Sequence, residues 1–244
     1  MGVKYLHADG IVIRQGIYQE DLTQNADLGR FIDLEDGRRY RYCKAEGAIT
    51  KGHVCQSAAI DGNHNYVTQT GYTLAIGDQD DLSIVVTVAP TKNDYAEGFL
   101  VINNDTGEGE MYKIRKNSAT SPCIVSLFDP IRVATAAASE ASLIQNKYRD
   151  VFVCAAGAQP TGVLVGVPNI TVTTGGYFFW AQVRGFCTMQ VETAATVGIA
   201  VTIADTTTAG AIELKAALTD LTVGTALYTA DNDLDYIVVD LRLE

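Results

Sequence analysis

Residues 31–43, with the sequence FIDLEDGRRYRYC, carry the clearest local signal for the fold. Residues that favour β-strands stand on both sides of Asp36-Gly37, a dipeptide typical of the two-residue turn in a tight hairpin. Counting outward from such a turn pairs Glu35 with Arg38, and the opposite charges of these side chains favour a cross-strand contact. The stretch therefore predicts an antiparallel β-hairpin.

Three further stretches have the patterns of antiparallel strands. Residues 81–90 (DLSIVVTVAP) predict a strand that ends at Pro90, and residues 97–116 predict two strands joined by a Gly-rich turn. In residues 235–244 (DYIVVDLRLE), apolar and polar side chains alternate, as in a strand with one buried face. These patterns predict an all-β protein made of two to three small antiparallel β-sandwich or barrel-like modules with little helix.

Helix signals are weak. Residues 132–150 are rich in Ala, which favours a helix, but they lack a continuous apolar stripe and contain Thr and Ser throughout. We expect mostly strand and loop there, with a helix as the alternative. Residues 211–221 (AIELKAALTDL) are expected to hold one or two helical turns.

Two shifts in composition suggest where domains end. Residues 57–71 are polar and rich in turn formers, and residues 155–162 (AAGAQPTG) resemble a linker of small residues. The expected division is an N-terminal arm (1–28), a β-hairpin module (29–70), a central β module (71–156) and a C-terminal β module (157–244).

The overall composition is that of a folded protein and argues against several kinds of partner. Hydrophobic residues make up 47% of the 244 residues and charged ones 19%, which is typical of globular chains. The chain has 29 acidic and 18 basic residues, so its net charge of -11 repels phosphate and we expect no direct nucleic-acid partner. No apolar run approaches the ~20 residues that cross a bilayer, so we expect no membrane partner. The first ten residues, MGVKYLHADG, also lack the pattern of a secretory signal.

The cysteines and histidines give no clear metal site. Cys43, Cys55, Cys123, Cys154 and Cys187 are far apart and form no Cys-x-x-Cys motif, which favours reduced thiols over disulfides. His53 and Cys55 are two residues apart and Cys43 precedes them, but no fourth zinc ligand follows in a recognised spacing. The acidic stretches DGNHN and DNDLD lack the Gly and Glu of a calcium-binding loop. We expect no metal and no cofactor.

The sequence also lacks the motifs of common enzymes. None of His7, His53 and His64 lies in a nucleophile or metalloprotease motif, and no Gly-x-Ser-x-Gly, phosphate-binding loop or dinucleotide fingerprint occurs. We therefore expect no enzymatic activity and no catalytic residues.

Residues 173–185, TTGGYFFWAQVRG, form the most aromatic stretch and contain Trp180, the only tryptophan. On a strand, Tyr177 and Phe179 would face a core, whereas Trp180 and Arg184 would share the opposite face. That second face begins aromatic and ends polar, so we expect it at a wet edge or between subunits. A sugar-stacking platform is the alternative, but a single Trp beside a core strand more often packs, so we expect Trp180 to be removed from water, in the core or between subunits.

Several stretches together resemble tailed-bacteriophage virion proteins of the capsid decoration (cement) or head structural class. They are residues 27–58 (DLGRFIDLEDGRRYRYCKAEGAITKGHVCQSA), 95–119 (YAEGFLVINNDTGEGEMYKIRKNSA), 126–134 (SLFDPIRVA) and 170–192 (ITVTTGGYFFWAQVRGFCTMQVE). The resemblance covers roughly residues 28–243 and carries no catalytic motif. It implies an all-β protein that binds the outside of a shell of major capsid proteins, as a homo-oligomer such as a trimer. Such a protein is assembled in the host cytoplasm and ends on the exterior of the virion.

The first 28 residues show no such resemblance and are expected to form an arm that reaches a partner. The residues expected at an interface are Ile11, Ile13, Tyr18, Trp180 and Arg184. The alternative function is a head-fibre or tail-associated adhesin that binds a host glycan, through residues 177–180 or the acidic turns. Copy number distinguishes the two, because cement proteins occur in hundreds of copies per virion and adhesins in few.

Overall fold

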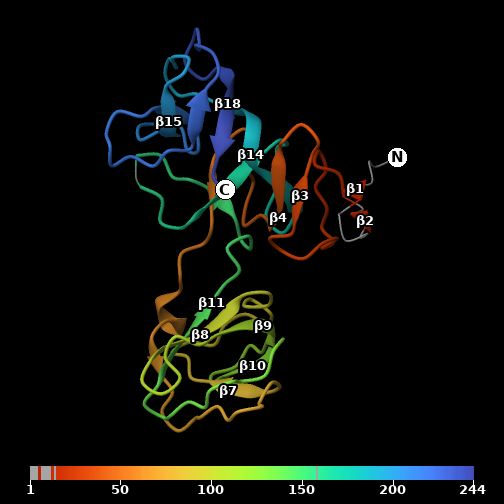
Figure 1. The fold of residues 1–244 in the computed structure, drawn as a ribbon, viewed down its shortest axis with the longest axis vertical. Coiled ribbons are helices and arrows are strands. Elements are labelled where there is room, and N and C mark those ends of the chain that lie inside the picture. Colours follow the sequence, from red (N-terminus) through yellow and green to blue (C-terminus); the bar gives the residue numbers. More distant parts are fainter. Residues whose placement is uncertain (1–4, 7–11, 14, 158) are drawn as a thin grey trace. The chain divides into compact units, whose positions relative to one another are not determined.

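The structure, a computed structural model, describes residues 5–6, 12–13, 15–157 and 159–244. This part of the chain contains antiparallel strands and one short 3-10 helix, η1 (Gly62–His64), and it has no α-helix. The strands form curled sheets (Figure 1). The predicted all-β fold is therefore confirmed.

The chain forms two compact units. The discontinuous unit consists of Met1–Ala58 and Lys147–Glu244, and the inserted unit consists of Ala59–Asn146. The chain leaves the discontinuous unit after β5 (Cys55–Gln56) and returns before β12 (Phe152–Val153), and these two strands pair with each other. The insertion therefore begins and ends at neighbouring strands of one sheet.

This division differs from the four modules expected from the sequence. Residues 29–58 and 157–244 share one sheet, because β4 (Arg39–Lys44) pairs along β14 (Phe178–Gln190). A change in composition marks a turn-rich connection, but it does not reveal strand pairing between segments far apart in sequence.

The sheet of the discontinuous unit follows the order β12-β5-β13-β14-β18-β17-β15-β16, and β4 pairs with both β3 and β14. A separate two-stranded sheet joins β1 (Tyr5–Leu6) and β2 (Val12–Ile13). The remaining strands of the unit are β3 (Phe31–Asp33), β13 (Leu164–Pro168), β15 (Ala200–Ile203), β16 (Ile212–Leu214), β17 (Gly224–Ala226) and β18 (Tyr236–Arg242).

The predicted hairpin at residues 31–43 forms as β3–β4, but its expected register is wrong. Leu34 N donates to Arg38 O at 2.9 Å, so Leu34 is the partner of Arg38 in place of Glu35. The loop has three residues, and of its Asp36-Gly37 pair only Gly37 has a positive φ, +86°. Hairpins with three-residue loops usually have this geometry, in which a turn is followed by a glycine in the left-handed region. The Asp36 carboxylate stabilises it by accepting from the backbone N of Arg38.

Strand β14 is the centre of the discontinuous unit. Its first half packs in one apolar cluster with Tyr42, and its second half packs in another through Cys187 and Met189. Trp180 is completely buried, with its ring centroid 4.9 Å from that of Tyr42. The expectation that Trp180 is removed from water is therefore confirmed by its place in the core, whereas the wet edge considered for its face is wrong at Trp180, because residues 15–28 cover this side chain.

Residues 15–28 pack on the discontinuous unit, so the expected arm is wrong for this part. The indole Nε1 of Trp180 donates to Gln15 O at 3.0 Å, Ile17 is in the core, and Asp21 pairs with Phe178. The physical reason is that aromatic side chains lie on both faces of β14, so both faces of the strand must be shielded from water. Most of residues 1–14 lie outside the described residues, and the expectation of an arm there stays a prediction.

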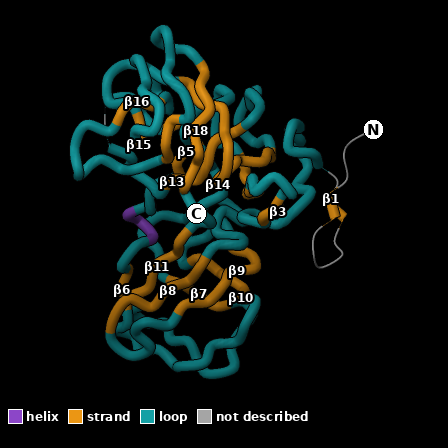
Figure 2. Tube along the Cα trace, turned by 45° about the horizontal axis from the view of Figure 1, so that its top comes forward, coloured by secondary structure: helices purple, strands orange, loops and turns teal. Residues whose placement is uncertain are grey.

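The inserted unit has its own six-stranded sheet, in the order β6-β11-β8-β9-β10-β7, and its own apolar core (Figure 2). The predicted hairpin at 97–116 is confirmed as β8–β9. The segments that follow the two edge strands meet, since the side chain of Gln69, after β6, accepts from Val85 N, after β7, at 2.8 Å. The strands are β6 (Val67–Thr68), β7 (Leu82–Ile84), β8 (Phe99–Asn104), β9 (Met111–Asn117), β10 (Cys123–Leu127) and β11 (Glu140–Ile144).

Both segments considered for helix contain strands. Residues 132–150 form β11 with flanking loops, as the preferred interpretation predicted. The helical turns expected in 211–221 are wrong, since β16 is followed by a turn in which the Asp220 carboxylate accepts from Ala217 N at 2.7 Å. A short acidic side chain competes in this way with helical hydrogen bonds.

Candidate functional site

A β-bulge in β14 creates the most unusual surface of the discontinuous unit. The register between β14 and β4 shifts between Gln182 and Arg184, and Gly185 follows with φ +83°. The buried Gln182 side chain holds this bulge, because its Nε2 donates to Arg184 O at 3.0 Å and to Phe186 O at 2.9 Å. A bulge bends its strand and redirects the neighbouring side chains.

The support beneath the bulge is a buried polar network. Tyr40, on β4, donates its hydroxyl to Gln182 Oε1 at 3.1 Å and accepts from Asn169 Nδ2 at 2.6 Å. Arg38 also donates to this hydroxyl, at 3.1 Å. Burial raises the pKa of Tyr40 well above its usual value, so the hydroxyl remains a donor at neutral pH. Satisfied networks of this kind are rigid.

Three arginines lie in one row across this surface. Arg184 on β14 is directly opposite Arg39 on β4 and Arg242 on β18, so the three side chains share one face of the sheet. Arg39 donates to Asp33 at 2.7 and 2.9 Å, and Arg242 pairs with Asp240 at 2.6 Å. The Arg184 guanidinium forms no ion pair or hydrogen bond with any described residue. We refer to Arg39, Arg184 and Arg242 as the arginine row.

The charges of the arginine row also affect its carboxylates. The hydrogen bond from Arg39 lowers the pKa of Asp33 despite partial burial, and the charges of Arg39 and Arg184 contribute to this shift. Asp33 therefore stays ionised at neutral pH. Its charge is already matched by Arg39, so it does not neutralise Arg184.

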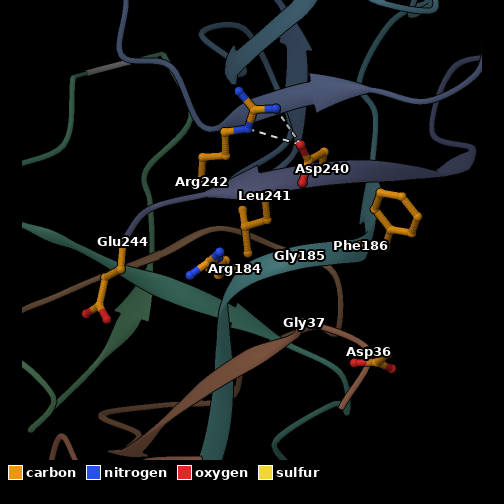
Figure 3. A pocket seen from close by; sticks show the side chains of 9 residues that line it. All are labelled: Asp36, Gly37, Arg184, Gly185, Phe186, Asp240, Leu241, Arg242 and Glu244. Atoms are coloured by element: carbon orange, nitrogen blue, oxygen red, sulfur yellow. Dashed lines mark hydrogen bonds and ion pairs between the residues drawn. The ribbon is translucent and has the colours of Figure 1, made fainter. Parts of the chain in front are cut away.

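A hollow of about 490 Å³ lies against this row. It is lined by Arg184, Phe186 and Arg242 together with Asp36, Asp240 and Glu244. Figure 3 shows Phe186 and Glu244 at opposite ends of the lining, with Arg184 between them. The Phe186 side chain is 61% exposed, although it lies on a central strand. The surface therefore combines an exposed aromatic ring with an unpaired guanidinium.

A second hollow, of about 480 Å³, adjoins the first through Phe186, which lines both. Tyr18, Arg38, Lys51, Asn169 and Tyr236 contribute to its lining. Aromatic rings, an amide and cations are side chains that can contact sugars or anions. Gln182, which holds the bulge, also lines this hollow.

The structure separates the residues expected at an interface. Arg184 and Tyr18 line the two adjoining hollows, whereas Trp180 is enclosed by its own chain and cannot contact a partner. Ile13 lies in β2, and Ile11 lies outside the described residues. The residue that sequence reasoning missed is Phe186. Its signal was the preceding Gly185, since a glycine inside a strand often marks a bulge.

The thiols and histidines are not arranged as an exposed reactive centre. Burial raises the pKa of Cys154 and of Cys187 to about 12 and that of Cys123 to about 11, so these groups are protonated at neutral pH. Among the described residues, no three His, Cys, Asp or Glu side chains are grouped as metal ligands. This part of the chain also contains no helix that is long and apolar enough to cross a bilayer.

The buried carboxylate of Glu192 has a structural role. Glu192 follows β14 and accepts hydrogen bonds from Thr207 N and Thr207 Oγ at 2.8 and 2.7 Å, and also from Thr206 Oγ and Thr208 N. Burial alone would raise the pKa of Glu192, but these hydrogen bonds lower it to about 2. Glu192 thus holds the loop that precedes β16.

No family model matches the chain, and neither the curated proteins nor the solved structures include a match.

Proposed function

We propose that this chain is a virion structural protein that binds the outer surface of a capsid shell and stabilises it, without enzymatic activity. The observation that carries the proposal is the exposed Phe186 beside the unpaired Arg184 on a rigid sheet. Aromatic and arginine side chains are the types most enriched at the energetic centres of protein interfaces. The hydrogen bonds of Gln182 fix the backbone of both residues before any partner binds, which lowers the entropic cost of association.

Two further observations support a capsid partner. The stretches of the discontinuous unit that resemble phage decoration proteins form β3–β4 and β14, the strands that build this surface. The net charge of -11 suits the outside of a shell better than its DNA-filled interior. Many copies, each bound modestly and arranged as a homo-oligomer, would stabilise the assembled shell by mass action.

Binding to bare capsids tests this proposal. Full-length protein is mixed with capsids of the phage that encodes it, and copies bound and the capsid melting temperature are measured. We expect saturation at a number comparable to the major capsid protein and a higher melting temperature. Phe186→Ala should bind more than about tenfold more weakly. Phe128→Ala, at a phenylalanine that is 47% exposed in the inserted unit, is the matched control. No binding by the full-length protein would refute the proposal.

A second candidate function is a head-fibre or tail-associated adhesin that binds a host glycan. The hollow lined by Tyr18, Asn169 and Tyr236 favours it, because aromatic faces and amides are common in sugar-binding sites. A densitometric gel of purified virions separates the two functions. A few copies per virion, together with saccharide binding that is lost in Tyr236→Ala, would support the adhesin.

A further inference from the structure

We propose that the arginine row binds a short acidic peptide segment of the partner, in which an Asp or Glu carboxylate pairs with Arg184. This inference rests on the proposed function, because it names the chemistry of the segment that docks at the same surface.

The first reason is that the like charges of the arginine row destabilise the sheet when no partner is bound. Like charges directly opposite each other on neighbouring strands destabilise a sheet. Arg184 has such a neighbour on each side, in Arg39 and Arg242. The chain has 29 acidic residues against 18 basic ones, so carboxylates that could pair with Arg184 are plentiful. Among the described residues none does, and the site therefore retains one uncompensated positive charge.

The second reason is the geometry of the row. A guanidinium donates two parallel hydrogen bonds to a carboxylate, and this pairing is more specific than that of an ammonium. Neighbouring strands are about 4.8 Å apart, so a row across three strands spans about 10 Å. Alternate residues of an extended peptide are about 7 Å apart, so about three residues of partner can follow the row.

The third reason is the apolar and acidic surroundings of Arg184. Phe186 presents an exposed ring in the same hollow as Arg184, at the end away from Glu244, which suits a peptide that carries an apolar side chain as well as a carboxylate. Asp36, Asp240 and Glu244 line the same hollow and repel a long polyanion. A peptide with one or two carboxylates therefore fits this site better than nucleic acid.

Charge variants test the inference on the full-length protein. Arg184→Glu should bind bare capsids more than about tenfold more weakly, and Arg184→Lys should lose affinity to a smaller extent. Lys116→Glu makes the same change in net charge on an exposed position of β9 and should bind like the unmodified protein. Raising the salt concentration should weaken the unmodified protein more than Arg184→Glu, because the charge pair is screened.

The same variants report on the row without any partner. Replacing Arg184 by Glu turns its repulsion from Arg39 and Arg242 into attraction, but it also turns its attraction to Asp33 into repulsion, so the melting temperature of the free protein should change by no more than about 1–3 °C. A loss of capsid binding in a protein that melts at nearly the same temperature cannot come from misfolding. A fall of more than about 3 °C would contradict the repulsion within the row on which the inference depends.

The outcomes distinguish this inference from the proposed function. If the unmodified protein does not bind capsids, the proposed function fails. If the unmodified protein binds and Arg184→Glu binds equally well, only the inference that an acidic segment pairs with Arg184 is refuted. A fluorescent peptide containing Glu-Phe-Glu should bind the unmodified protein, whereas its Gln-Phe-Gln counterpart should not. Stronger competition by inorganic phosphate or by a single-stranded oligonucleotide than by the acidic peptide would overturn the inference in favour of a phosphate ligand.

Discussion

The two units use the same secondary structure in different ways. The inserted unit is built from contiguous residues around one apolar cluster. The discontinuous unit joins segments far apart in sequence around two clusters, and β14 contributes to both. Its solvent-facing surface carries the arginine row. A unit of contiguous residues can form without pairing between distant segments, so we expect the inserted unit to unfold independently. In the discontinuous unit, pairing between distant segments builds β14, the strand that carries Arg184.

Among the proposed substitutions, Trp180→Ala should have the largest effect, because it should destabilise the discontinuous unit and leave the inserted unit unchanged. It leaves a large cavity at the centre of the discontinuous unit and removes the bond to Gln15, so we expect a loss of about 3–5 kcal/mol. Hydrogen exchange should accelerate in β4 and β14 and remain slow in β8 and β9. Equal acceleration in both units would show that they unfold as one.

Ile114→Ala is the reciprocal change. Ile114 is fully buried in the cluster of the inserted unit, and its truncation should cost about 2–4 kcal/mol. The emission of Trp180 should stay blue-shifted through the first unfolding transition, because the discontinuous unit remains folded. A red shift that coincides with that transition would contradict the independence of the units.

The dependence of stability on pH should differ between the units because of Glu192. Its pKa is lowered to about 2 from the usual 4.5, so its contribution to the free energy of unfolding is present above pH 4.5 and is lost as the pH falls toward 2. Glu192→Gln should cost about 1–3 kcal/mol at neutral pH by removing charged hydrogen bonds, and should flatten this acid dependence. Melting curves between pH 2 and pH 6, assigned to each unit by hydrogen exchange, measure the effect. An unchanged acid dependence in the variant would exclude Glu192 as its source.

Gly37→Ala should have the smallest effect. The position has open space around it, so the cost arises only from its φ of +86° and should be about 1 kcal/mol. Thermal unfolding of the variant measures this value, and Gly47→Ala, at an open position without a positive φ, is the control. A cost of several kcal/mol would indicate that the hairpin tip is more tightly constrained than its surroundings suggest.

Local patterns in the sequence predicted several strands, but they missed β16, where helical turns were expected, and they did not predict which strands pair. The alternation in residues 235–244 correctly predicted the buried face of β18, and the Gly-rich turn predicted β8–β9. The β3–β4 register was missed because an Asp-Gly pair fits both a two-residue and a three-residue loop. The cover over Trp180 was missed because it depends on residues 15–28, which are distant in sequence and have little apolar pattern.

The candidate site was predictable only in part for the same reason. Arg184 was identified from its position after the aromatic run, and Tyr18 from the short apolar piece that it forms with Ile17. The arginine row could not be recognised, since its members are on three strands whose register is set by a bulge. Strict alternation places Phe186 on the face of Phe178 and Trp180, which the structure buries, whereas the bulge between Gln182 and Arg184 leaves Phe186 exposed.

The pairing of β5 with β12 has a consequence for how such proteins change over time. Gln56 and Phe152 are directly opposite each other, so the base of the insertion has the geometry of a hairpin end, whichever polypeptide connects the two strands. A short turn or a foreign domain with neighbouring termini satisfies that geometry equally well. This junction is therefore a natural position for evolutionary exchange of domains, and for displaying an unrelated protein on the same scaffold.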